Sequence, residues 1–244
     1  MNLRRTLATA RRVLTQIHHD PRTIGLLLIV PSLLIGLMAW LFSDTGVFDL
    51  VGPAMIALFP FIIMFLITSI TTLRERQGGT LERLLALPTG KLDFILGYTL
   101  AFGLLAIVQS SIAVGFAVWV CGLEIEGSMW LLLAVAIADA VLGTALGLLA
   151  SAFAQTEFQV IQFMPALVFP QILLGGVFLA REDMPDVLHA ISDWLPLSHA
   201  IDALNAVARD SEDAGYVGTK LLIIGAFIVG AIVLGSITLR RRTP

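Results

Sequence analysis

The chain has 244 residues, of which 57% are hydrophobic and 14% charged, and its mean hydropathy is +0.92. These values exclude a soluble globular domain and indicate a protein that crosses a membrane several times. The single cysteine, Cys121, excludes an internal disulfide. The formal net charge of -3 is less informative than the position of the charges, because basic and acidic residues occupy different segments.

The first segment, residues 2–20, has the pattern of an amphipathic helix. Arginine pairs at positions 4–5 and 11–12 flank its apolar stripe. We expect such a basic helix to lie in the membrane interface, with its arginines toward anionic headgroups. A cleaved signal peptide is not expected, because the first long apolar run begins only at Ile24 and exceeds a signal core. The stripe consists of Leu3, Leu7, Ala10, Leu14 and Ile17.

Six apolar runs are long enough to cross a bilayer as helices. Five contain no charged residue, and the fourth contains only Asp139. We therefore expect an all-α polytopic membrane protein with six transmembrane helices. The predicted spans are residues 24–42, 51–73, 94–120, 129–153, 158–180 and 221–239.

The orientation of these spans follows from the positions of Lys and Arg. Twelve of the 15 lie in the N-terminal segment, in the 74–91 loop and in the C-terminal tail. The alternate loops hold the other three, together with twelve of the 18 acidic residues. Because cytoplasmic loops are enriched in Lys and Arg, both termini and the 74–91 loop are predicted to be cytoplasmic. The topology is N-in and C-in.

The one sizeable external segment is residues 181–220. It contains two apolar helical faces separated by Pro196, which predicts two short helices lying in or dipping into the outer leaflet before the last span. There is no internal repeat. We expect a single transmembrane domain over 1–244, made of an interfacial helix (1–23), spans one to five (24–180), external helices (181–220) and span six (221–239).

The 74–88 loop contains the pattern of a second short helix. Gly78 and Gly79 interrupt the preceding span, Thr80 offers an N-cap hydroxyl, and Pro88 ends the element. Two helical turns are marginally stable in water without a surface to dock on. The sequence leaves open whether that surface is another protein or the lipid and the chain itself. Its apolar face is Leu81, Leu84 and Leu85, and Glu82 points away from it.

This loop resembles the coupling-helix region of type-2 ABC exporter permeases, most closely the multidrug and antibiotic-resistance (daunorubicin-resistance-like) branch. The resemblance rests on Arg-Glu-Arg at 74–76, Gly-Thr-Leu-Glu at 79–82, and the leucine pair before Pro88. It extends to Gly-Gly-Val-Phe at 175–178 and Trp-Leu-Pro-Leu at 194–197. In that family the coupling helix occupies a groove of a cytosolic ATPase. The resemblance assigns ATPase coupling to Glu75, Gly79, Thr80, Leu81, Glu82, Leu84 and Leu85.

The resemblance also implies partners and location. A transporter of this family with six spans per chain needs two permeases, identical or different, and two separate ATPase subunits that use ATP and Mg²⁺. It sits among the lipids of the bacterial plasma (inner) membrane. Its cargo is expected to be hydrophobic or amphipathic, such as a drug or lipid, since the spans offer apolar surface. Lipid-linked glycan exporters belong to the same family and remain an alternative.

No catalytic pattern accompanies these features. Gly90-Lys91 and Thr219-Lys220 lack the upstream glycines of a phosphate-binding loop, and no nucleophile elbow or zinc-type His/Cys cluster occurs. The chain is therefore not expected to be an enzyme, to bind a metal or cofactor, or to bind nucleic acid. Its four histidines are interpreted as solvated: His18, His19, His189 and His199.

The spans contain a few polar residues with two interpretations each. Folding spans three and four as a hairpin brings Asp139 level with Ser110, so Asp139 either bonds the two helices together or faces a cavity, as a proton-coupled carrier would need. Gln162 and Gln171, with two prolines in span five, either line a substrate cavity or serve packing. The Gly143/Gly147 pair allows close helix contact, within one chain more readily than between chains. A non-transporting scaffold would leave the leucine face unexplained.

Overall fold

The computed structural model describes residues 3–43, 45–78, 91–211 and 213–238, and the regular structure in these ranges is helical. Six of its helices are long and apolar enough to cross a membrane, as predicted. The helices are α1 (Leu3–His18), α2 (Pro21–Leu41), α3 (Val47–Gln77), α5 (Lys91–Trp119), α6 (Met129–Phe153), α7 (Glu157–Leu174), the 3₁₀ turn η1 (Arg181–Asp183), α8 (Asp186–Ser192), α9 (Pro196–Ala208) and α10 (Ala214–Thr238). The six candidate spans are α2, α3, α5 from Ile95, α6, α7 and α10.

The observed span boundaries lie within four residues of the predicted ones, except for the end of span five and the beginning of span six. Span five was predicted to reach residue 180, but α7 ends at Leu174 because Gly176 takes a left-handed conformation, with φ of 88°. Span six was predicted to begin at residue 221, but α10 begins at Ala214, where the Asp213 carboxylate accepts the Tyr216 backbone N–H. The segment between α7 and α10 therefore covers residues 175–213 instead of the predicted 181–220, so it both begins and ends about six residues earlier.

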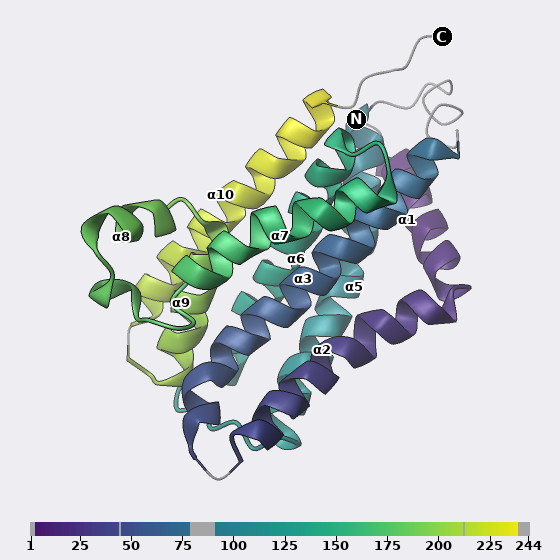
Figure 1. Ribbon diagram of the computed structural model, residues 1–244. Helices are drawn as coiled ribbons and strands as arrows, with labels where there is room; N and C mark the ends of the chain where they lie inside the picture. Colours follow the sequence, from purple (N-terminus) through teal and green to yellow (C-terminus); the bar gives the residue numbers. More distant parts are fainter. Residues whose placement is uncertain (1–2, 44, 79–90, 212, 239–244) are drawn as a thin grey trace.

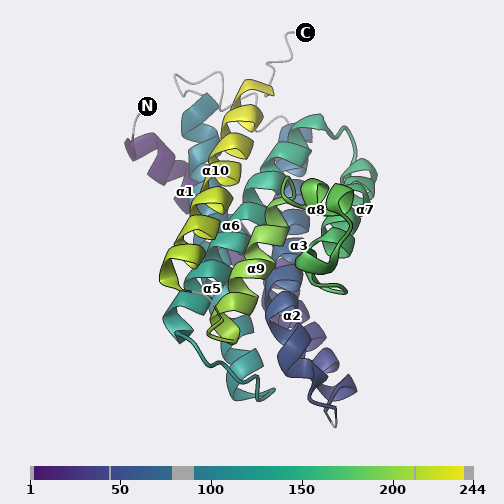
Figure 2. The ribbon, with the colours of Figure 1, turned by 90° about the vertical axis from the view of Figure 1, so that its left-hand side faces the viewer.

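Helix α6 is the centre of the bundle. It lies between α3 on one side and α5 and α10 on the other, while α7 covers the outer side of α3 (Figures 1 and 2). The beginning of α1 and the ends of α3 and α10 lie at one end of the bundle (Figure 1). These ends lie together because an even number of spans separates each of them from the next.

The contact between α3 and α6 depends on the predicted glycine pair. A Cβ atom on Gly143 would lie 2.5 Å from the Phe61 carbonyl oxygen, and one on Gly147 would lie 2.6 Å from that of Phe65. Both distances are too short for a side chain, so the glycines allow the two backbones to approach closely. The pair therefore packs within the chain, as the sequence favoured.

Helix α1 packs on α5, but with a different face from the predicted stripe. Its buried residues are Thr6, Ala10, Val13 and Ile17, whereas Leu3 and Leu7 are 65% and 52% exposed. Helix α1 presents this other face because it approaches α5 closely at Gly97, where a Cβ atom would lie 2.6 Å from that of Thr9. The close approach selects small residues of α1 for the contact and leaves the leucines on the outside.

Helix α9 is buried on nearly every side, unlike the amphipathic outer-leaflet helix that the sequence predicted. Eleven of its 13 residues are buried, and it packs among α3, α6 and α10. Its C-terminal end is tied to the loop between α5 and α6, because the Glu126 and Gly127 backbone N–H groups donate to the Ala208 and Val207 carbonyls at 2.9 and 3.2 Å. Short α8 was predicted from the same external segment and is present.

Candidate functional sites

Glu75, at the end of α3, joins three helices. Its carboxylate accepts a hydrogen bond from the Arg12 guanidinium of α1 at 2.8 Å and another from the Tyr98 hydroxyl of α5. Arg12 also donates to the Tyr98 oxygen at 2.8 Å. Burial opposes the charge on Arg12, but Tyr98 and Glu75 outweigh it and raise the Arg12 pKa, so the guanidinium stays charged.

The neighbouring residues of α3 bind the other side of the bundle. Arg74 forms a two-pronged ion pair with Glu157, the first residue of α7, at 2.7 and 2.9 Å. Arg76 donates to the Ser151 carbonyl of α6, and the Gln77 amide donates to the Gln155 carbonyl at 2.6 Å. We call residues 74–77 the α3 terminus. It contacts α1, α5, α6 and α7 directly before the loop that resembles a coupling helix.

The predicted coupling residues fall on both sides of the described boundary. Gly79, Thr80, Leu81, Glu82, Leu84 and Leu85 lie outside the described residues. Glu75 is described, and its side chain is only 10% exposed and bonded within the chain. This position suits an internal anchor, whereas the family resemblance assigned Glu75 to ATPase coupling. Glu157 likewise has an internal partner, Arg74.

The three polar residues predicted to line a cavity have different environments. Asp139 is fully buried in α6, and within the described residues neither carboxylate oxygen has a hydrogen-bond partner. Gln162 is exposed on α7. Gln171 is 3% exposed and bonds the Leu167 carbonyl at 2.9 Å and the Leu197 backbone N–H at 3.1 Å. Gln171 thus caps the start of α9.

The predicted hairpin of α5 and α6 has the expected register near Asp139, but not the expected bond. Ser110 of α5 donates its hydroxyl to the Ala136 carbonyl of α6 at 3.2 Å. Because Ala136 lies three residues before Asp139, the serine is close to the predicted level. It bonds the backbone instead of the Asp139 carboxylate.

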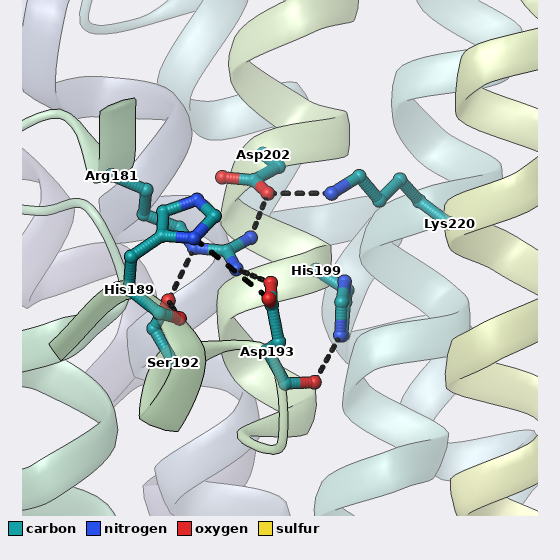
Figure 3. Close-up of polar contacts among 7 residues, drawn as sticks. All are labelled: Arg181, His189, Ser192, Asp193, His199, Asp202 and Lys220. Atoms are coloured by element: carbon teal, nitrogen blue, oxygen red, sulfur yellow. Dashed lines mark hydrogen bonds and ion pairs between the residues drawn. The ribbon is translucent and has the colours of Figure 1, made fainter. Parts of the chain in front are cut away.

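A cluster of charged residues that the sequence analysis did not identify joins η1, α8, α9 and α10. Arg181 is only 7% exposed, and its guanidinium donates to the Ser192 hydroxyl at 2.8 Å and to the carboxylates of Asp193 and Asp202 (Figure 3). The Lys220 ammonium of α10 donates to the same Asp202 carboxylate at 2.7 Å. Two cations and two anions thus neutralise each other in what we call the Arg181 cluster.

Two histidines belong to this region, and the prediction that both are solvated is wrong for His199. His199 is 5% exposed, and its Nε2 lies 2.9 Å from the Asp193 carbonyl. Burial lowers its pKa, and Lys220 and Arg181 lower it further against the opposing effects of Asp193 and Asp202. His189 is half-exposed and lies 3.8 Å from the Asp193 carboxylate (Figure 3).

The Arg181 cluster forms one wall of a cavity of about 560 Å³. Apolar and aromatic side chains, among them Phe178, Leu179 and Tyr216, line other parts of it. The cluster was missed because its members are spread over residues 181–220, where the charges fit a solvated loop. The one available signal was Lys220, a lone cation at the border of the last apolar run.

The comparisons with known proteins agree with these features. The chain is 27% identical over 159 residues to an ABC transporter G family member 20 of Dictyostelium discoideum. It is 28% identical over 152 residues to the probable multidrug ABC transporter permease YbhR, and 25% identical over 146 residues to the inner membrane transport permease YhhJ, both of Escherichia coli. These matches cover 65%, 62% and 59% of this chain but only 22%, 41% and 39% of the relatives.

A family match covers most of the chain, from α1 to the end of α9. The description of the matching family is ABC-2 type transporter, and the matched residues are 4–208. The six candidate spans and the multidrug permease relatives agree with a membrane component of an ABC transporter. The chain belongs to the ABC-2 type transporter family and is a multi-pass permease.

Proposed function

We propose that this permease moves hydrophobic or amphipathic compounds, such as drugs or lipids, outward across the plasma membrane, driven by ATP hydrolysis in a partner. The names of the YbhR and YbhS relatives, both probable multidrug ABC transporter permeases, support this class of cargo. The mainly apolar spans support it as well. A lipid-linked glycan as cargo is the alternative within the same family.

The observation that carries the proposal is the α3 terminus. Each of its four residues forms a bond outside α3: Glu75 bonds α1 and α5, Arg74 bonds α7, Arg76 bonds α6, and Gln77 bonds the connection between α6 and α7. A force applied to the following loop therefore reaches four helices through short polar contacts. Such a junction is suited to convert closure of an ATPase into movement of the bundle.

We further propose the composition of the whole transporter. ABC-2 permeases work with an ATPase and as dimers, so two permeases and two cytosolic ATPase subunits would form the complex. ATP and Mg²⁺ would bind to the ATPase subunits. Both termini and the 79–90 loop would face the cytoplasm of a bacterial cell, with residues 81, 84 and 85 docked in the ATPase groove.

The test is substitution of Leu84 by Ala, followed by co-purification of the ATPase and measurement of ATP hydrolysis. Loss of a buried leucine side chain costs about 2–4 kcal/mol, which weakens a subunit interface by tens- to hundreds-fold. Glu82→Ala is the control, because an exposed charge contributes about 0–1 kcal/mol. Wild-type binding and hydrolysis in both Leu84→Ala and a Leu81/Leu85 double alanine variant would refute coupling through this loop.

A second variant separates docking from transmission. Glu75→Gln removes the charge that pairs with Arg12, but it leaves the leucine face intact. We expect the ATPase to remain bound while the permease no longer stimulates hydrolysis to the wild-type rate. Equal loss of binding in Glu75→Gln and Leu84→Ala would show that Glu75 contacts the ATPase directly.

A proton-coupled carrier is the rival function, and the buried, unpartnered carboxylate of Asp139 is the observation that favours it. A proton relay needs several ionisable groups, and Asp139 is the only acidic residue within the predicted spans. Transport in inverted vesicles distinguishes the two mechanisms. An exporter stops when the ATPase is inhibited and continues with a protonophore, whereas a proton-coupled carrier does the reverse.

A further inference from the structure

A second cavity, of about 430 Å³, lies between α1, α2 and α5. Most of its lining is apolar: Leu14 and Ile17 come from α1, Leu27 and Leu28 from α2, and Leu105 and Val108 from α5. The volume lies within the range of about 300–1,000 Å³ that is typical of small-molecule sites. Neither the ATPase coupling nor the Arg181 cluster involves these residues.

Two basic side chains stand at the edge of this groove. Arg11 and His18 both line it, both are exposed, and within the described residues neither has an ion-pair partner. Helix α1 contains no acidic residue. The nearest acid along the chain, Asp20, already accepts bonds from the Arg22 and Thr23 N–H groups and, at 2.7 Å, from the Thr23 hydroxyl. Within the described residues, the basic edge of this apolar groove therefore has no anionic partner.

We propose that this groove binds one anionic phospholipid. Its headgroup phosphate would contact Arg11 and His18, and one acyl chain would lie between α2 and α5 against Leu105 and Val108. The surface beside the groove supports a lipid, because Leu26, Ile29 and Leu33 of α2 are 56%, 61% and 58% exposed and form a lipid-facing side. The charge complements an anionic headgroup, and the apolar lining complements a hydrocarbon chain.

The site gives α1 a specific role. On one face α1 packs against α5, and through Arg12 it bonds the α3 terminus. A lipid held between α1, α2 and α5 would fill the remaining space behind that contact. The membrane composition would then influence how firmly α1 supports the junction before the coupling loop. The lipid site itself does not depend on the proposed export function.

The experiment is native mass spectrometry of the full-length permease, purified in detergent and titrated with phosphatidylglycerol or phosphatidylcholine. We expect the wild-type protein to retain one phosphatidylglycerol in preference to phosphatidylcholine. Arg11→Gln should weaken that binding about fivefold, because one arginine near an anionic lipid contributes about 1 kcal/mol and 1.4 kcal/mol is a factor of ten. Arg22→Gln is the matched control, since this exposed arginine is close in sequence but does not line the groove.

A second pair of variants tests the apolar part. Val108 lines the groove and is 44% exposed, whereas Ile107 does not line it and is 43% exposed. Val108→Trp should lose the bound lipid, and Ile107→Trp should retain it. If Arg11 bound only a free phosphate ion, the bound species would persist in Val108→Trp and would be displaced by added inorganic phosphate. Either result would overturn a lipid site.

The remaining outcomes also decide the question. Equal losses in Arg11→Gln and Arg22→Gln would show diffuse attraction of anionic lipid to a basic helix instead of a site. Equal retention of phosphatidylcholine would show an apolar groove without headgroup recognition. If a second copy of the chain covered the groove, Val108→Trp would reduce the dimer peak and leave the lipid count unchanged.

Discussion

Replacement of Arg181 by Gln should strongly destabilise the permease. The guanidinium is nearly buried and bonds two carboxylates and a hydroxyl that belong to α8, the α8–α9 connection and α9. Removing one partner of a buried ion pair costs about 3–5 kcal/mol. Here the cost is reduced, because Asp202 keeps Lys220 at 2.7 Å and the Asp193 side chain is 52% exposed to solvent. We expect a loss of about 2–3 kcal/mol in the free energy of unfolding.

The assay is thermal unfolding of the detergent-solubilised protein, followed by the loss of the monodisperse peak in size-exclusion chromatography. For a chain of this size, 1 kcal/mol shifts Tm by about 2–4 °C, so Arg181→Gln should lower Tm by about 5–10 °C. Arg209→Gln is the matched control. Arg209 lines the same cavity, but it is exposed, and among the described residues its guanidinium donates only to the Leu50 carbonyl, at 3.2 Å. Its loss should change stability by about 0.5 kcal/mol.

The ranking within the cluster sharpens the test. Asp193→Asn should have a small effect of about 0–1 kcal/mol, because this carboxylate is half-exposed. Asp202→Asn should have a large one, because it removes the anion that Arg181 and Lys220 share. Equal Tm values for Arg181→Gln and Arg209→Gln would refute the argument that the Arg181 cluster fastens α8, α9 and α10 together.

Three further predictions concern the interior. Asp139→Asn should retain expression and assembly, because the carboxylate has no hydrogen-bond partner to lose within the described residues; abolished transport in a well-assembled variant would instead show that the charge is needed. Gly143→Leu should cost about 1–3 kcal/mol, measured as a lower Tm, because its Cβ would meet the Phe61 carbonyl at 2.5 Å, whereas Gly103→Leu has open space and should be tolerated. The permease should lose stability as the pH falls below about 6.5, since the His199 pKa is lower in the folded chain and the unfolded chain then binds the extra proton. Tm measured at pH 7.5 and 5 should therefore differ less in His199→Asn than in the wild type.

Local patterns predicted the spans well because each depends on neighbouring residues. Residues 129–153 were predicted as a span from their apolar composition alone, and α6 has the same bounds. The Gly143/Gly147 spacing likewise predicted a close helix contact, which α3 provides. In these cases the local composition and the spacing of residues along a helix are enough to predict the structure.

The remaining features depend on pairing between distant residues, which a single sequence does not specify. Arg12, Glu75 and Tyr98 lie on three helices, and nothing in their local sequence links them. Arg181 and Lys220 resembled loop charges because the tertiary fold, not the local pattern, buries them. The amphipathic face of α9 was visible, but the burial of Ser198 and His199 on its other side follows only from the three surrounding helices.

The position of α9 has a consequence for how the chain is made. At 13 residues α9 is about 20 Å long, too short to cross a hydrocarbon layer of about 30 Å, so it cannot be inserted as a span of its own. Of the three long helices that enclose it, α3 and α6 are synthesised before it and α10 after it. The ribosome therefore releases α9 while one wall of its final site is still missing. The C-terminal part of the chain must complete its fold in one late step, in which α10 enters the membrane and packs against α9.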